Sequence, residues 1–96
     1  MKRDDFVFTI GFHGNVAIVD GKAKRKYGKL GTMELAERGL YRSAFASALY
    51  AGSELELEQF MEYYRAQTGS EITGVESFKR LFGVDEAREV SKTIAV

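Results

Sequence analysis

Apolar residues recur every three or four positions along residues 32–50, the longest helix-forming stretch of the chain. This spacing places them on one face of a helix. Gly39 interrupts the stretch, and glycine in a helix interior costs about 1 kcal/mol relative to alanine. Either one helix tolerates Gly39 for close packing, or a first helix capped by Thr32 ends before Gly39 and a second covers residues 40–50. We favour two helices.

The second half of this stretch is rich in small side chains, which are Ser43, Ala44, Ala46, Ser47 and Ala48. Small residues let a neighbouring element approach closely, so the pattern predicts a core helix pressed against a sheet. A seam between two copies of the chain is the alternative. A membrane-spanning helix is not expected, because Arg42 interrupts the stretch and the chain has no run of about 18 apolar residues.

A different periodicity precedes this stretch. Residues 6–12 alternate as in a strand, residues 16–19 are rich in β-branched side chains, and residues 13–15 between them suit a tight turn. The pattern predicts an antiparallel hairpin. The side chains expected on one face are Phe6, Phe8, Ile10, Phe12, Ala17 and Val19. Because the other face is also apolar, we expect helices to cover one face and at least part of the other.

The Asp-Gly pair at residues 20–21 permits a second tight turn and a third strand over residues 22–27. That strand would place Lys22 and Lys24 on the apolar face of the hairpin. We therefore expect an exposed basic loop or a short helix that ends at Tyr27.

Two further helices carry recognisable start signals. Residues 53–56 and residues 73–76 match the capping box, in which a Ser or Thr and a Glu three positions later satisfy each other's backbone N–H groups. Apolar stripes follow each box and predict helices over residues 54–67 and 75–82. The glycines expected to end helices in this half are Gly52, Gly69 and Gly83.

The last thirteen residues fit two structures. Asp85 can cap a helix over residues 86–92, or Val90, Ile94 and Val96 can share one face of a strand added to the hairpin. We favour the strand, because a hairpin alone is marginally stable. The predicted fold is α+β: an N-terminal antiparallel hairpin, with or without this third strand, packed against three or four helices in one domain of residues 1–96.

Composition narrows the function classes. The chain has 96 residues and no cysteine, which excludes disulfides and thiol chemistry, and no apolar run near its start marks a secretory signal. We therefore expect a cytoplasmic protein. Residues 1–30 hold seven basic and three acidic residues, a net charge of +4, and the remainder holds seven basic and eleven acidic, a net charge of −4. This asymmetry suits self-association or complementarity within one fold.

No set of residues predicts catalysis, a metal site or a cofactor. His13 is the only histidine and lies in a predicted turn, with no nucleophile or second ligand nearby in the sequence. Glu54, Glu58 and Glu62 recur every four positions, as expected for a solvated helix face. Because no phosphate-binding glycine motif occurs either, we expect a protein that is not an enzyme.

The basic segment is the clearest functional signal. Its candidate contact residues for phosphate or a partner are Lys22, Lys24, Arg25, Lys26, Tyr27 and Lys29. Clustered cations neutralise phosphates and release counterions, and a tyrosine can stack on a base. The alternative is a solvated segment that balances the acidic helices.

Tyrosines supply a second signal, because one small core cannot bury all of them deeply. Tyr63 lies off the apolar stripe of its helix and is our candidate for a protein interface. The sequence therefore predicts a small protein-interaction module, with a homodimer as one form. The alternative is a nucleic-acid-binding module that uses residues 22–29.

Overall fold

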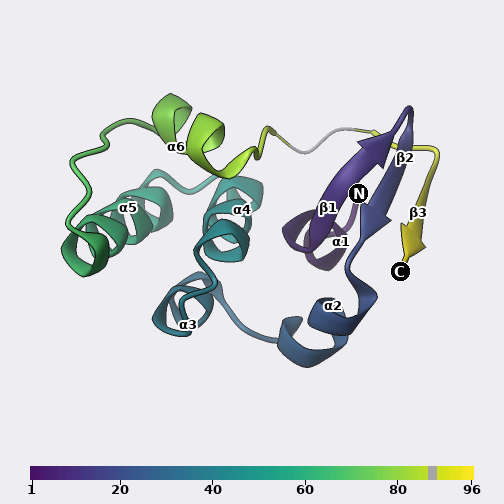
Figure 1. The fold of residues 1–96 in the computed structure, drawn as a ribbon, viewed down its shortest axis with the longest axis horizontal. Coiled ribbons are helices and arrows are strands. Elements are labelled where there is room, and N and C mark those ends of the chain that lie inside the picture. Colours follow the sequence, from purple (N-terminus) through teal and green to yellow (C-terminus); the bar gives the residue numbers. More distant parts are fainter. Residues whose placement is uncertain (87–88) are drawn as a thin grey trace.

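The computed structural model describes residues 1–86 and 89–96 and has an α+β fold (Figure 1). In chain order its elements are α1 (Arg3–Val7), β1 (Thr9–His13), β2 (Val16–Val19), α2 (Gly21–Tyr27), α3 (Thr32–Glu37), α4 (Tyr41–Ala51), α5 (Glu54–Thr68), α6 (Val75–Phe82) and β3 (Lys92–Ala95). The predicted hairpin and C-terminal strand are confirmed. The described residues form six helices because residues 3–7 and 21–27 are also helical.

The first helix, α1, lies where the sequence pattern predicted the start of a strand. The N–H of Phe6 donates to the carbonyl of Lys2 (3.0 Å), and the N–H of Phe8 donates to that of Asp4 (3.2 Å). Phe6, Val7 and Phe8 are all buried, and α1 packs against α4. A short apolar run fits a buried helix as well as a strand, so periodicity alone could not separate the two.

A β-bulge changes the faces of the hairpin. Thr9 pairs with Val19 but Gly11 pairs with Ile18, so Ile10 is the extra residue on β1. Ile10 is 58% exposed, whereas Phe6 and Phe8 are buried outside the strand. The predicted face shared by Phe6, Phe8, Ile10 and Phe12 is therefore wrong, although Ala17 and Val19 are buried as expected.

The sheet is mixed, with β2 in the centre. β1 pairs with β2 in antiparallel fashion, and β3 pairs with the other side of β2 in parallel. All four residues of β3 are exposed. The alternative helix over 86–92 includes residues 87 and 88, which lie outside the described residues, whereas Lys92–Ala95 form the strand that we favoured.

The central stretch consists of two helices, α3 and α4, as we favoured. Gly39 has φ = +77°, and its N–H donates to the carbonyl of Ala36 (2.9 Å), while the N–H of Leu40 donates to that of Leu35 (3.0 Å). These two bonds form a Schellman motif, the common helix ending that needs a left-handed residue. Glycine adopts that conformation without strain, which explains why the helix breaks here.

Thr32 does not cap α3, contrary to our expectation. Gly31 occupies the capping position, and its N–H donates to Oε1 of Glu34 (3.1 Å). Thr32 is instead the first helical residue and is 4% exposed, and its hydroxyl lies 2.8 Å from that of Ser47 on α4. A buried hydroxyl requires such partners, so tertiary packing decides its role.

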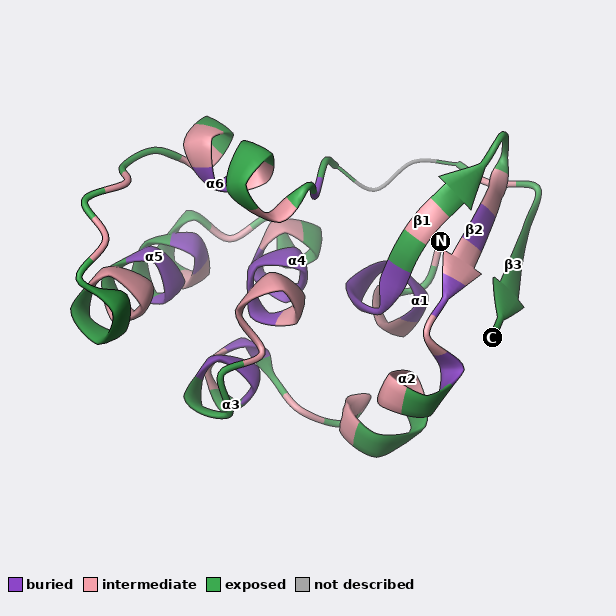
Figure 2. Cartoon of the chain, viewed as in Figure 1, coloured by how far each residue is buried: buried purple, intermediate pink, exposed green. Residues whose placement is uncertain are grey.

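The small residues of α4 lie inside the protein. Ala44, Ala46, Ser47 and Ala48 are buried, and α4 packs against α1, α3 and α5 (Figure 2). Short side chains allow these three helices to approach the same segment. The helix lies in the core as predicted, but it packs mainly against helices and not against the sheet, and these buried residues do not form a seam between copies.

Helices α5 and α6 begin differently. Ser53 caps α5 by accepting from the N–H of Glu56 (3.2 Å), but the Glu56 carboxylate accepts from the Thr32 hydroxyl instead of completing the box. At α6 the predicted capping box is wrong: Gly74, with φ = +84°, precedes the helix without a side-chain cap. Both helices end at left-handed glycines, as does α4, in agreement with the sequence pattern.

The helices share an aromatic core. Phe45 of α4, Phe60 of α5 and Phe78 of α6 are fully buried, with ring centroids 5.9–6.0 Å apart. Tyr64 and Phe82 extend this cluster at its edge. Aromatic rings dominate core energetics through their area and their edge-to-face contacts. This core fixes α4 and α6, the two helices that approach β1.

Candidate functional site

The basic segment folds as helix α2 directly after the hairpin. A carboxylate oxygen of Asp20 accepts from the N–H of Ala23 (3.0 Å) and caps the first turn. Cations in the last turn suit the negative end of the helix dipole. At Gly28 an added Cβ would lie 2.5 Å from the carbonyl oxygen of Lys24, so only glycine fits this tight ending.

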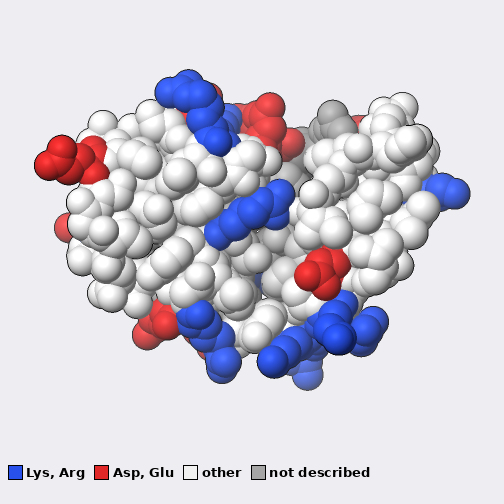
Figure 3. Space-filling model, viewed as in Figure 1, with Lys and Arg blue, Asp and Glu red and all other residues white. Residues whose placement is uncertain are grey.

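The structure places the predicted contact residues on one helix and its ending, but not all of them are available. Lys24 forms an ion pair with the buried Asp5 (2.6 Å), and the ring of Tyr27 is half-buried with the ammonium of Lys26 5.3 Å from its centroid. The exposed cations are Lys22, Arg25, Lys26 and Lys29. In Figure 3 Lys and Arg side chains gather over α2 at one end of the molecule.

None of the described acidic residues forms an ion pair with these exposed cations within 4.0 Å. Glu54, Glu58 and Glu62 are exposed on α5, as the sequence predicted, and α5 and α2 lie on opposite sides of α3 and α4 (Figure 1). Within residues 1–86 and 89–96, the only ion pair of α2 is Lys24 with Asp5. The positive charge of α2 therefore faces solvent.

Tyr63 lies on α5 and is not part of the basic surface at α2. Its ring is half-buried against the hydrophobic core, where it lines a shallow hollow with Met33 of α3 and Ala66 of α5. This position is the edge of the core. Its assignment as an interface residue stays a prediction.

The outer face of the sheet is a surface that sequence reasoning missed. The side chains lining a shallow hollow of about 640 Å³ on it include Ile10, Val16, Ile18, Lys92 and Ile94. Ile10 is 58% exposed and Ile94 is 41% exposed. The signal was present in the apolar alternation of both strands, but the bulge and the pairing of β3 decide which side chains meet here.

The free edge of β3 adjoins α2. The N–H of Gly21, the first residue of α2, donates to the carbonyl of Val96 (3.1 Å). A Cβ built at Gly21 would lie 3.4 Å from a guanidinium nitrogen of Arg25 and 3.1 Å from the Cβ of Ala95. Arg25 therefore borders the end of β3, while Lys92 occupies its start.

The described part of the chain contains no group of three or more potential metal ligands. The side chain of His13 is exposed and makes no hydrogen bond or ion pair with any other described residue. No helix among those described is long and apolar enough to span a bilayer.

Comparison with known proteins gives no relative. No protein-family description, no curated protein and no solved structure matches this chain. Functional proposals therefore rest on the geometry of the surface and its chemistry.

Proposed function

We propose that this protein is a protein-interaction module that binds an extended acidic segment of a partner along the free edge of β3. The observation that carries this proposal is the exposure of β3, which pairs only with β2 in the described structure. An edge strand presents unpaired N–H and C=O groups that can add a further strand. This mode of recognition takes affinity from backbone bonds and specificity from alternate side chains.

The opposite edge of the sheet is a poorer site. At the start of β1 the carbonyl of Thr9 already accepts from the guanidinium of Arg42 (2.7 Å), so it is not free for an added strand. The edge of β3 is therefore the better candidate for augmentation.

The cations around the edge of β3 indicate the charge of the partner segment. Lys92 at the start of β3 and Arg25 and Lys22 beside its end are cationic, and Lys92 also lines the apolar hollow. An added strand with alternating apolar and acidic side chains complements both features. A second copy that paired antiparallel through β3 would bring Lys92 toward the cations of α2, so the homodimer is disfavoured at this edge.

Amide NMR tests this proposal with a designed twelve-residue peptide that alternates valine and glutamate, and with a matched valine–lysine peptide. We expect the acidic peptide to shift the β3 amides and the basic peptide to leave them unchanged. Ile94→Asp adds a negative charge at the edge and should weaken binding at least about tenfold, or about 1.4 kcal/mol.

The control is Leu55→Asp, an equivalent change at an exposed apolar residue (66%) on α5. It should leave peptide affinity unchanged. Concentration-dependent broadening without peptide, removed by Ile94→Asp, would instead identify a homodimer. No shift with either peptide would reject an edge-binding module.

A nucleic-acid-binding module is the second candidate, favoured by the four exposed cations of the basic segment. Each phosphate contact lowers the logarithm of affinity by about 0.7–0.9 per logarithmic unit of salt. If RNA or DNA binds, replacing Lys22, Arg25 and Lys26 by Gln should reduce this salt slope by about two to three. Lys24 is kept, because its partner Asp5 is buried. A slope unaffected by these replacements would exclude phosphate binding at α2.

A further inference from the structure

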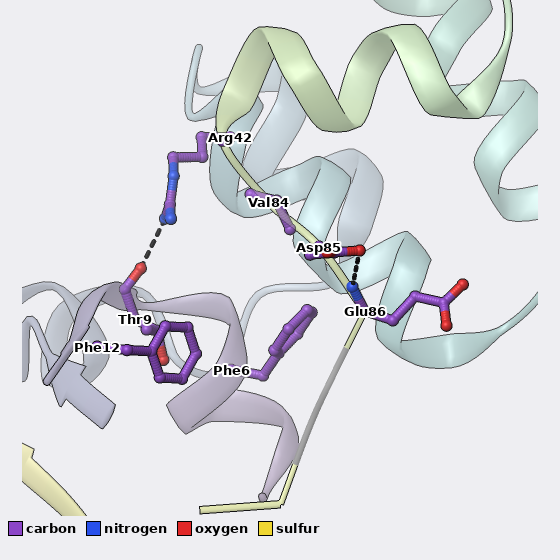
Figure 4. A pocket seen from close by; sticks show the side chains of 8 residues that line it. Phe6, Thr9, Phe12, Arg42, Val84, Asp85 and Glu86 are labelled. Carbon is purple, nitrogen blue, oxygen red and sulfur yellow. Dashed lines mark hydrogen bonds between the residues drawn. The ribbon is translucent and has the colours of Figure 1, made fainter. Parts of the chain in front are cut away.

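A cavity of about 490 Å³ lies where β1 and α1 approach α4 and the segment that follows α6. Its described lining residues are Phe6, Thr9, Phe12, Arg42, Gly83, Val84, Asp85 and Glu86. Cavities of about 300–1,000 Å³ with mostly apolar walls and a few placed polar groups are typical of small-molecule sites. Its described lining includes one cation, two carboxylates and two phenylalanine rings (Figure 4).

Arg42 is held in place by backbone carbonyls. Its Nη1 donates to the carbonyl of Thr9 on β1 (2.7 Å), and its Nε donates to that of Phe82 at the end of α6 (3.1 Å). A guanidinium has five N–H groups in a fixed plane. These two bonds orient it and leave N–H groups for a further acceptor.

Arg42 has no carboxylate partner within 4.0 Å among the described residues, although burial desolvates it and lowers its pKa from the usual value. The acids at the rim are directed elsewhere. Lys79 lies 3.2 Å from Oε1 of Glu86 and 3.9 Å from Oδ1 of Asp85. The hydrogen bond that Lys79 donates to the carboxylate of Glu86 is the largest cause of the raised pKa of Lys79. A desolvated cation without an anion is unfavourable, so an anionic ligand would stabilise it.

We propose that this cavity binds a small aromatic monocarboxylate, with its carboxylate on Arg42 and its ring against Phe6 and Phe12. A carboxylate matches the planar donors of a guanidinium. A single charge is preferred because only one described cation lines the cavity, and the carboxylates of Asp85 and Glu86 at its rim would repel a dianion such as a phosphate monoester. Phe6 is buried beneath the cavity, whereas Phe12 is 42% exposed and lies at its mouth.

Titration of the isotope-labelled protein with benzoate and phenylacetate, each to about 10 mM, tests this proposal, since ligands of this size bind with Kd on the order of 1 mM. We expect shifts at the amides of Thr9, Gly83 and Val84 and at the Nε–H of Arg42. Benzamide has the same shape without the charge and should give no shifts. Phenyl phosphate should bind more weakly than benzoate.

Arg42→Lys keeps the charge but removes the planar donors, and should weaken benzoate binding at least about tenfold. Arg38→Lys, at an exposed residue after α3, is the matched control and should bind as the unmodified protein does. Phe12→Ser tests the ring contact at the exposed mouth without removing a buried group, and should also weaken binding. Equal binding of benzamide, tighter binding of phenyl phosphate, or no shift at 10 mM would each overturn the proposal.

Discussion

At the scale of single residues, a network of polar side chains connects four helices through hydrogen bonds. Nη2 of Arg3 donates to the hydroxyl of Ser47 (3.0 Å), which lies 2.8 Å from the hydroxyl of Thr32, and Thr32 in turn donates to the carboxylate of Glu56. These residues belong to α1, α4, α3 and α5. Ser47 and Thr32 are 5% and 4% exposed. Ser47 and Thr32 each have two partners in this network, and no buried side-chain polar atom among the described residues lacks a partner.

Replacing Ser47 by alanine tests how much this network contributes to the free energy of unfolding. We expect Ser47→Ala to lower the free energy of unfolding by about 1–3 kcal/mol, because it removes two hydrogen bonds that are each worth about 0.5–1.5 kcal/mol. Ser43→Ala on the same helix is the control, since Ser43 is half-buried and makes no side-chain hydrogen bond with a described residue. Its effect should stay within about 0.5 kcal/mol. Urea denaturation measures both, and equal losses would mean that the network contributes nothing beyond α4 itself.

At the scale of elements, local chemistry explains which boundaries were predictable. Gly39, Gly52, Gly69 and Gly83 end helices or follow them with positive φ, and each was identified because few other residues adopt that conformation without strain. The failures lie where tertiary contacts decide. Residues 3–7 form α1, which packs against α4. Thr32 does not occupy the capping position, because its hydroxyl belongs to a buried hydrogen-bond network. No periodicity within the segment encodes these partners.

Gly39→Ala distinguishes two helices from one. At φ = +77° an alanine is strained, so we expect the free energy of unfolding to fall by about 1 kcal/mol. Space is not the reason, because an added Cβ would meet nothing within 4 Å. If residues 32–50 formed one helix in solution, the same change would instead stabilise the protein by about 1 kcal/mol.

Gly11→Ala provides the matched control for Gly39→Ala. Gly11 lies in β1, has no positive φ, and would also place an added Cβ in open space. Alanine there should be neutral or slightly stabilising, because it restricts the unfolded chain. Chemical denaturation of both variants separates backbone strain from the general loss of a glycine.

At the scale of the whole molecule, the three candidate sites depend to different degrees on pairings that the sequence only partly specifies. The basic segment was evident in the sequence as a run of cationic residues, and the structure adds that Lys24 forms an ion pair with Asp5. The edge of β3 becomes a candidate site only once β3 pairs in parallel with β2, and the cavity at Arg42 needs β1 beside the end of α6. Such long-range placements follow from the shared core, not from local pattern.

We expect the local stability of the edge strand β3 to be lower than that of the core helix α4. This strand pairs only with β2 in the described structure and all four of its residues are exposed, whereas α4 packs against three helices at the centre of the core. Local opening needs less free energy where few buried contacts must break. We expect the hydrogen-bonded amides of β3 to exchange at least about 100-fold faster than those of α4, a difference of about 2.7 kcal/mol. Hydrogen exchange followed by NMR measures this. Equal protection of β3 and α4 would show one cooperative unit and contradict the prediction, whereas slower β3 exchange with the acidic peptide is the response expected of an added strand.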